Sequence, residues 1–202
     1  MSNKRKKKKS GCVGFAVVVL IVILCVAVFI YGDMFSKIRM GIEYKLYPLK
    51  YEQEIIDAGE KYGLEPELIA AVIYAESRFR EDATSSVGAI GLMQIMPETF
   101  QWLCDKRGEE HETEELYDPY INIDYGAFCL SWLYEQFGDI YTACAAYNAG
   151  FGAVEDWLEQ GIYTTDGITL YNIPYGETSN YVAKIKDAVP KYNELYFDNN
   201  QY

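Results

Sequence analysis

The chain has 202 residues, of which 50% are hydrophobic, and it carries 18 basic and 30 acidic residues for a formal net charge of −12 at pH 7. All acidic residues lie at or after Asp33 against only 12 basic ones, so this part carries roughly −18 and disfavours nucleic acid, whose phosphates need a basic face. With one histidine in the whole chain, a catalytic zinc site is also disfavoured.

The N-terminal part predicts a membrane anchor. Residues 1–10 form a basic tail, and residues 11–32 form an apolar run without a charged side chain. About 20 apolar residues suffice for a helix that crosses a bilayer, and no small-residue cleavage site precedes Asp33. We therefore expect an uncleaved, single-pass signal anchor in the plasma membrane. The positive-inside rule predicts a cytoplasmic N-terminus and a body on the extracellular, cell-wall side.

The rest of the chain predicts a stalk or continuing helix over residues 33–50, one all-α or mostly α domain over 51–195, and a C-terminal tail over 196–202. Apolar periodicity, together with Gly and Pro at segment ends, places the helices. The predicted helices are 51–62, 66–79, 88–95, 97–106, 121–137, 140–148, 150–160 and 177–195. Polar stretches predict loops at 81–87, 107–120 and 161–176, the last with a short hairpin as the alternative over 162–173.

Glu76 is an acid within an otherwise apolar helical pattern. The residues that share its stripe are Ile69, Val72, Ile73 and Phe79. Burial disfavours an ionised carboxylate, so the pKa of Glu76 should rise and its protonated form should persist near neutral pH. Such an acid suits general acid catalysis of glycosidic bond cleavage. The alternative is a glutamate at the edge of the stripe that reaches water or Arg80.

Other catalytic chemistries find little support in the sequence. His111 is alone in a polar loop, and nothing around Cys104 supports a cysteine–histidine pair. The segment 88–91 lacks the Lys and Ser/Thr of a phosphate-binding loop. The three cysteines of the body, Cys104, Cys129 and Cys144, allow at most one disulfide, and the sequence leaves open whether it forms. Carboxylates remain as the plausible catalytic groups, with no cofactor and no metal expected.

Four segments combine with the helix of Glu76. They are Glu76-Ser-Arg-Phe79, the stretch Ser85-Ser-Val-Gly-Ala-Ile-Gly-Leu-Met-Gln-Ile-Met-Pro97, Ala146-Tyr-Asn-Ala-Gly150 and Glu177-Thr-Ser-Asn-Tyr-Val182. In this order they closely resemble the soluble lytic transglycosylase catalytic domain of the lysozyme-like superfamily, over about residues 51–192. The departures are minor: Ser86 stands where many relatives carry Pro or Lys, and Ala183 stands where Pro is frequent.

The resemblance implies an all-α lysozyme-like domain that acts on bacterial peptidoglycan. Glu76 falls on the catalytic acid of the family, which cleaves the β-1,4 bond between MurNAc and GlcNAc and leaves a 1,6-anhydro-MurNAc end. The expected substrate-binding residues are Ser85, Gly91, Met93, Gln94, Tyr147, Asn148, Glu177 and Tyr181. Five loop tyrosines are further candidates as sugar platforms: Tyr117, Tyr120, Tyr163, Tyr171 and Tyr175.

Structural roles stand beside some of these assignments: Met93 as a core residue, Asn148 as a cap at a helix junction, and Glu177 as a cap of the last helix. A hydrolytic muramidase on the same fold is the nearest alternative activity, and it needs a second carboxylate from Glu177, Glu155 or Asp156. A catalytically silent glycan-binding module is the alternative from another class. The sequence names no partner in cell-wall or secretion machinery, and it leaves open endo or exo action, stem-peptide preference, biological process and oligomeric state.

Overall fold

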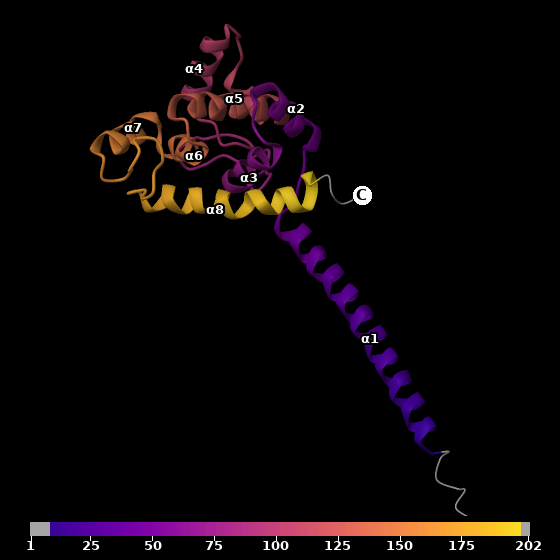
Figure 1. Ribbon diagram of the computed structural model, residues 1–202. Helices are drawn as coiled ribbons and strands as arrows, with labels where there is room; N and C mark the ends of the chain where they lie inside the picture. Colours follow the sequence, from indigo (N-terminus) through magenta and orange to yellow (C-terminus); the bar gives the residue numbers. More distant parts are fainter. Residues whose placement is uncertain (1–8, 199–202) are drawn as a thin grey trace, which may run out of the picture. The chain divides into compact units, whose positions relative to one another are not determined.

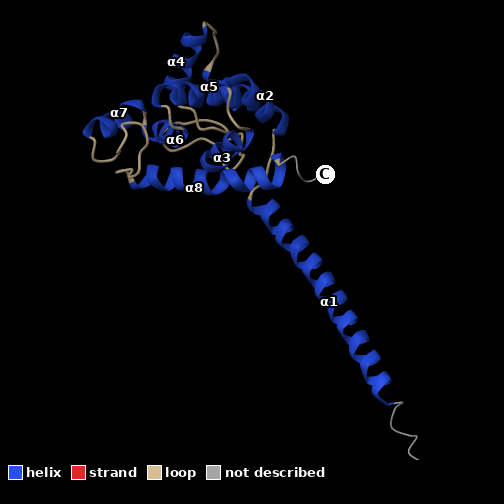
Figure 2. Cartoon of the chain, in the orientation of Figure 1, coloured by secondary structure: helices blue, strands red, loops and turns tan. Residues whose placement is uncertain are grey.

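A computed structural model describes residues 9–198 (Figure 1). Residues 1–8 of the predicted basic tail and residues 199–202 of the predicted C-terminal tail lie outside the described residues. The boundary between two compact units falls between Leu46 and Tyr47. Figure 2 shows helices joined by loops, and the described residues contain isolated β-bridges but no strand, so the all-α prediction is confirmed.

The N-terminal unit contains one helix, α1 (Lys9–Leu46). Within its stretch Val17–Leu46, the most apolar window of 18 residues has a mean hydropathy of 2.8, and the helix is long and apolar enough to cross a membrane. The helix does not stop where the apolar run ends. Salt bridges between residues four apart, Lys37 to Asp33 at 2.8 Å and Arg39 to Glu43 at 3.9 Å, favour further helical turns. The segment predicted as a stalk or a continuing helix is therefore helical as far as Leu46.

The second unit contains the remaining helices. They are α2 (Glu52–Tyr62), α3 (Pro66–Glu76), α4 (Pro97–Arg107), α5 (Pro119–Phe137), α6 (Ile140–Ala149), α7 (Phe151–Gln160) and α8 (Gly176–Tyr192), with a 3-10 turn η1 (Thr113–Tyr117) and a π-helical turn η2 (Asn193–Phe197). A proline in the first turn starts α3, α4 and α5, because its missing N–H has no helical partner there. Glycines in left-handed conformation end α2, α4, α5 and α7.

The core lies around α3, which packs along α8, and around α5, which packs against α2 and α6 (Figure 1). Ile69, Val72 and Ile73 of α3 are fully buried, as the predicted stripe requires. Because α3 is enclosed by its neighbours, any side chain at its end is held by a rigid support. Helix α3 therefore places its last residue, Glu76, with little freedom.

Two departures from the predicted helices bear on the site, while the last helix, predicted to residue 195, ends at Tyr192 before the π-helical turn η2. Helix α3 ends at Glu76 rather than Phe79, because Arg78 and Phe79 both adopt left-handed conformations, with φ of 53° and 61°. The segment 88–95 is not a helix, so that prediction was wrong. Gly91 and Gln94 have φ of +79° and +49°, and the segment folds instead into turns closed by antiparallel bridges from Ile90 to Thr84 and Ile95.

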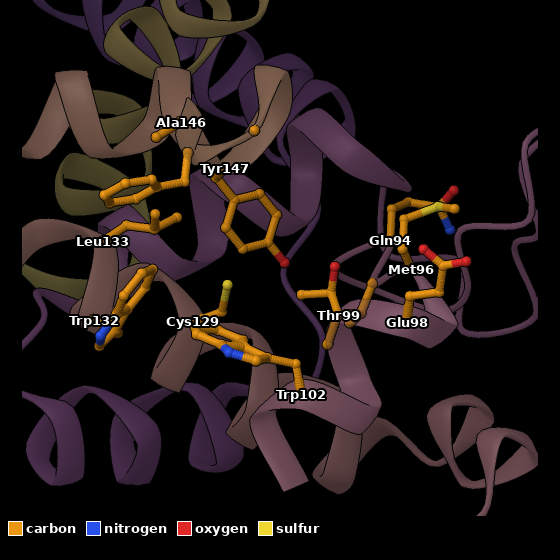
Figure 3. A pocket seen from close by; sticks show the side chains of 13 residues that line it. Gln94, Met96, Glu98, Thr99, Trp102, Cys129, Trp132, Leu133, Ala146 and Tyr147 are labelled. Carbon is orange, nitrogen blue, oxygen red and sulfur yellow. The ribbon is translucent and has the colours of Figure 1, made fainter. Parts of the chain in front are cut away.

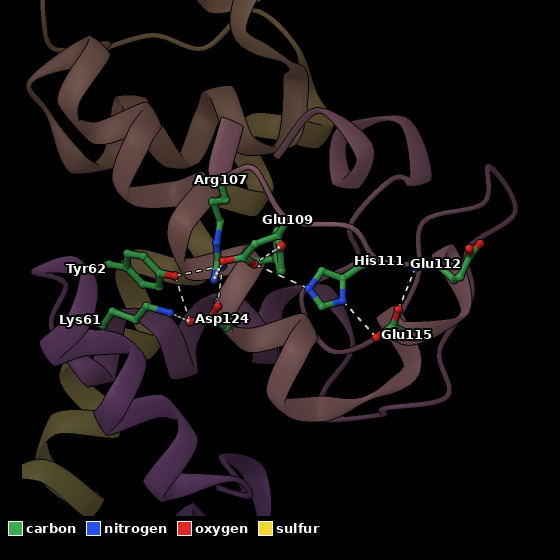
Figure 4. Close-up of polar contacts among 9 residues, drawn as sticks. Lys61, Tyr62, Arg107, Glu109, His111, Glu112, Glu115 and Asp124 are labelled. Atoms are coloured by element: carbon green, nitrogen blue, oxygen red, sulfur yellow. Dashed lines mark hydrogen bonds and ion pairs between the residues drawn. The ribbon is translucent and has the colours of Figure 1, made fainter. Parts of the chain in front are cut away.

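A polar network centred on Asp124 joins α2, α4 and α5 (Figure 4). The Asp124 carboxylate accepts hydrogen bonds from Lys61 at 2.7 Å, Tyr62 at 2.9 Å and Arg107 at 2.5 Å. Arg107 also pairs with Glu109 at 3.0 Å. Because Asp124 is buried, these partners are what make its negative charge tolerable in the core.

Candidate active site

Glu76 is the last residue of α3, and the turn after it directs the chain away. The backbone N–H of Ser77 donates to Ile73 O at 2.9 Å and closes the helix, while Ser77 itself is buried. The left-handed Arg78 and Phe79 then reverse the chain, and the Phe79 side chain enters the core with 1% exposure. Glu76 is left mostly buried at the rim of the core.

The surroundings of Glu76 favour its protonated form. Burial raises the pKa of Glu76 to about 7, and the nearby charge of Glu177 acts in the same direction. The Tyr181 hydroxyl and the Lys184 ammonium act in the opposite direction and lower this pKa. At neutral pH the carboxyl group is therefore present in both protonation states. A group that first gives a proton and then takes one needs both states to be accessible.

Two tyrosines lie close to Glu76, the partly buried Tyr147 and the buried Tyr181. Tyr147 of α6 donates its hydroxyl hydrogen to Met93 O at 2.8 Å, and Tyr181 of α8 is 8% exposed. Burial raises the pKa of both phenols well above 10, and the charge of Glu76 contributes to both shifts. The Tyr181 hydroxyl has no hydrogen-bond partner in good geometry within the described part of the chain. Glu76, Tyr147 and Tyr181 are thus brought together by α3, α6 and α8.

The segment from Ser85 to Gln94 forms a compact turn held by its own hydrogen bonds. The Ser85 hydroxyl oxygen accepts from Ala89 N at 2.9 Å. Gln94 donates through Nε2 to Gly91 O at 2.8 Å and to Ala83 O at 3.1 Å.

Gly91 and Met93 take part in packing within this segment. A Cβ atom at Gly91 would lie 2.2 Å from Asn122 Nδ2 and 2.5 Å from Leu116 O, so only glycine allows this close approach. Met93 is fully buried, and its backbone N–H donates to Asn122 Oδ1 at 2.7 Å.

Asn148 and Glu177 lie where α6 and α8 meet. Asn148 Oδ1 accepts a hydrogen bond of 2.8 Å from the hydroxyl of Thr178, which is buried. This bond fixes the start of α8 against the end of α6. Glu177 is exposed in the first turn of α8, a position in which the helix dipole favours an acid.

A groove of about 480 Å³ lies beside this cluster, between α4, α5 and the junction of α6 and α7 (Figure 3). Tyr147 and Gln94 belong to its wall, so the groove is continuous with the predicted site residues. The other residues of its wall are Ile95, Met96, Glu98, Thr99, Trp102, Cys129, Trp132, Leu133, Ala146, Gly150 and Phe151. Trp102 and Trp132 meet edge to face with centroids 4.8 Å apart.

The aromatic wall of the groove was missed by the sequence analysis. Trp102 is 37% exposed, and no sequence signal could have found this wall, because Trp102 and Trp132 come together only through the packing of α4 on α5. None of the five loop tyrosines proposed as sugar platforms lines this groove. Among them, Tyr171 donates to Ile162 O at 2.6 Å within its own loop, and Tyr175 packs on Trp157 of α7 with centroids 4.9 Å apart, so both have structural contacts.

The chain matches the model of the family described as "Transglycosylase SLT domain" over residues 53–165, more than half of its length. The chain belongs to this family. The matched range contains the Glu76 helix, the Ser85–Gln94 turn and the groove, while α8 lies after it.

Named relatives agree with this assignment. The chain is 34% identical over 148 residues to the soluble lytic murein transglycosylase of Salmonella typhimurium, covering 69% of this chain and 22% of the relative. It is 32% identical over 166 residues to the membrane-bound lytic murein transglycosylase C of Haemophilus influenzae, covering 71% and 46%. A solved complex of the 70-kDa soluble lytic transglycosylase with bulgecin A superposes with a TM-score of 0.69 at 30% identity, covering 78% of this chain and 26% of the other. The chain therefore spans less than half of the length of each.

Proposed function

We propose that this chain is a membrane-anchored lytic transglycosylase that cleaves the β-1,4 bond between MurNAc and GlcNAc in peptidoglycan, with Glu76 as its acid and base. The observation that carries the proposal is one mostly buried carboxyl group with a pKa of about 7 at a rigid helix end, beside a groove of about 480 Å³, in a chain of the SLT family. The names of the relatives support murein as the substrate.

The proposed reaction uses Glu76 twice. Its protonated carboxyl group gives a proton to the glycosidic oxygen, the bond from that oxygen to C1 of MurNAc breaks, and GlcNAc leaves with a free hydroxyl group. The acetamido oxygen of MurNAc stabilises the electron-poor C1. The Glu76 carboxylate then takes the proton of the C6 hydroxyl group while O6 bonds to C1, which closes the 1,6-anhydro ring. Glu76 is again protonated and no water is consumed.

The carboxylates around Glu76 favour this route over hydrolysis. A muramidase usually needs a second carboxylate to act as a nucleophile or to activate water. Glu177 raises the pKa of Glu76, but it is exposed in the first turn of α8. Glu155 and Asp156 are exposed on α7. None of the three is a buried partner of Glu76, so we assign the base to Glu76 itself.

The groove supports a glycan strand as the ligand. Aromatic rings stack on sugar faces, and the groove offers Trp102, Trp132 and Phe151 together with the polar groups of Gln94 and Tyr147. The Tyr181 hydroxyl lies close enough to the Glu76 carboxyl group to lower its pKa, so it suits a hydrogen bond to the acetamido group or a hydroxyl group of a sugar bound there. We assign Ser85 and Gln94 to the substrate side, with Gly91, Met93 and Asn148 acting through the packing and hydrogen bonds described above.

The proposed location is the plasma membrane, with α1 as a single span. Its apolar length and the name of the Haemophilus influenzae relative support an anchor. Six basic residues precede the apolar run, against Lys37, Arg39 and Lys45 in the turns that follow it, and this excess supports a cytoplasmic N-terminus and a catalytic unit that faces the cell wall.

Mass spectrometry of muropeptides released from purified sacculi tests the activity. The full chain in detergent is compared with Glu76→Gln and with Glu155→Gln, which alters an exposed acid on α7. Anhydro-ended fragments from wild type and Glu155→Gln, but not from Glu76→Gln, are expected. Reducing-ended fragments would establish the muramidase instead, and retained sacculus binding without release by wild type would establish the silent module. Bulgecin A, bound in the solved relative, is expected to inhibit release.

A further inference from the structure

The end of the helix that carries Glu76 is tied to α8 by Lys184. The Lys184 ammonium donates to Ala75 O at 2.8 Å, across 109 residues of sequence. Ala75 directly precedes Glu76 in the last turn of α3, where carbonyl groups have no helical partner. A cation at this end is favourable for the helix dipole as well as for the hydrogen bond.

Lys184 is confined to this place by its neighbours. Its ammonium lies 5.2 Å from the centroid of the Tyr74 ring, and the Arg78 guanidinium lies 5.5 Å from the same centroid. Burial and the charge of Arg78 lower the pKa of Lys184, while the charge of Glu76 raises it. The ammonium is thus held close to the Glu76 carboxyl group rather than extended into water.

The groups that face Glu76 come from α6 and α8. Helix α6 contributes the Tyr147 phenol and the Cys144 thiol, whose pKa values are both raised by burial first and also by the charge of Glu76. Helix α8 contributes Tyr181, Glu177 and Lys184. Within this set Lys184 is the cation.

We propose that Lys184 is a positioning residue for Glu76: it locks the last turn of α3 onto α8 and keeps a fixed positive charge beside the carboxyl group. The proposal rests on the proposed function in so far as Glu76 is the acid and base. Its chemical consequence follows from the two proton transfers. The positive charge limits how strongly burial favours the protonated acid, and it stabilises the carboxylate that exists between the first transfer and the second.

Three substitutions separate the two parts of this role. Lys184→Met removes both the charge and the donor, Lys184→Gln removes the charge but leaves a shorter donor, and Lys184→Arg keeps both. Lys186→Met is the matched control, because Lys186 lies on the same helix but sits over the Tyr141 ring, 4.6 Å from its centroid.

The primary readout is the pKa of Glu76, which needs no enzymatic activity. The full chain in detergent micelles, labelled with ¹³C at the glutamate carboxyl carbon, is titrated by NMR, and the Glu76 signal is identified by its loss in Glu76→Gln. Lys184→Met and Lys184→Gln are expected to raise this pKa by roughly one unit, whereas Lys184→Arg and Lys186→Met leave it at the wild-type value. An unchanged pKa in folded Lys184→Met and Lys184→Gln would overturn the proposal.

The activity readout follows from the titration. If Glu76 is the acid, the basic limb of the pH profile of kcat/KM moves upward by the same amount in Lys184→Met, and Lys184→Arg restores it. A structural role alone lowers the melting temperature without moving either the NMR pKa or the limb, and that result also overturns the proposal. An NMR shift in a protein that releases no muropeptides upholds the role of Lys184 and contradicts the proposed function.

Discussion

Glu76 owes its place in the candidate site to the turn that follows it. Its carboxyl group is partly buried, because the rest of the apolar stripe of α3 lies in the core. The stripe predicts that the helix continues, which it does not, because Arg78 and Phe79 take left-handed conformations that non-glycine residues rarely adopt. The early end of α3 is what leaves the carboxyl group at the rim, within reach of α6 and α8.

The raised pKa of Glu76 has a cost in stability that Glu76→Gln should remove. The folded-state pKa of about 7 exceeds the ordinary value of 4.5, so the folded protein binds more protons than the unfolded chain between these values. Stability is therefore lost as pH rises from about 4.5 through about 7. The neutral amide avoids this loss, and we expect Glu76→Gln to be more stable than wild type by up to about 3 kcal/mol at pH 8.

Urea unfolding of both proteins at several pH values measures this difference. The advantage of Glu76→Gln should shrink toward zero as the pH falls to 4, where the wild-type carboxyl group is protonated in the folded state. An advantage that stays constant from pH 4 to pH 8 would show that ionisation is not its cause.

Gly91 is the glycine for which the structure gives the strongest packing reason. Gly91→Ala combines a φ of +79° with overlap of Asn122 and the Leu116 carbonyl, neither of which is a flexible side-chain end. We expect a loss of at least about 3 kcal/mol, because overpacking adds to backbone strain. Gly88→Ala is the control, since Gly88 has a φ of +93° but no atom within 4 Å of an added Cβ, and strain alone costs about 1 kcal/mol. Thermal melts of both variants test this, and equal losses would contradict it.

At the scale of elements, the sequence predicted the helices well and the turn from Ser85 to Ile95 poorly. Proline starts and glycine stops mark most helix ends, and apolar periodicity marks their buried faces. The turn also has apolar residues at helical spacing, so periodicity alone misleads there. Its conformation depends on contacts far along the chain, chiefly the Asn122 side chain, which accepts from Met93 N and donates to Ile90 O at 3.0 Å. The local sequence of the turn cannot predict a contact with Asn122.

The same limit applies to the site. Glu76 could be predicted from the sequence because an acid among apolar residues is conspicuous, and Tyr181 and Tyr147 could be predicted from their motifs. Trp102 and Trp132 could not be predicted, because their pairing joins α4 to α5 and exists only in the folded protein. Lys184 was missed for the same reason, since its partner Ala75 lies 109 residues away.

The network around Asp124 joins three elements, and its removal should destabilise them together. Burial alone would raise the pKa of Asp124, but hydrogen bonds from Lys61, Arg107 and Tyr62 outweigh it and lower this pKa. The stabilising contribution is present above the ordinary value of 3.8 and is lost as pH falls below it. Asp124→Asn leaves the Arg107 charge, whose side chain is 16% exposed, without its main partner, so we expect a loss of about 3 kcal/mol at pH 7.

Urea unfolding at pH 7 and pH 3 checks this expectation. The difference between Asp124→Asn and wild type should be smaller at pH 3. Glu155→Gln serves as a control, because Glu155 is exposed on α7 and its removal should cost less than about 1 kcal/mol. If Asp124→Asn lowers the free energy of unfolding no more than this control does, the network does not stabilise the fold beyond an exposed surface residue.

At the scale of the whole molecule, charge and hydropathy divide the chain in the same place. The basic residues of the tail precede the apolar part of α1, and every acidic residue follows at or beyond Asp33. The acidic body gains nothing from the negative surface of a bilayer, so the proposed attachment rests on the apolar helix, with the basic tail as the one segment that surface charge would attract. We therefore expect the chain to stay with membranes at high salt and at alkaline pH and to leave them only in detergent.

A substitution in the apolar run tests the anchor directly. Leu24→Arg places a charge in the middle of this run, which costs about 3 kcal/mol on insertion scales, whereas Leu24→Phe costs nothing comparable. We expect Leu24→Arg to shift a measurable share of the protein out of the membrane fraction, with Leu24→Phe distributed like wild type.

In spheroplasts, added protease should digest the part after Asp33 in wild type, because the positive-inside rule places it outside. Protection of that part in intact spheroplasts, with digestion after lysis, would reverse the orientation and remove the enzyme from its proposed substrate.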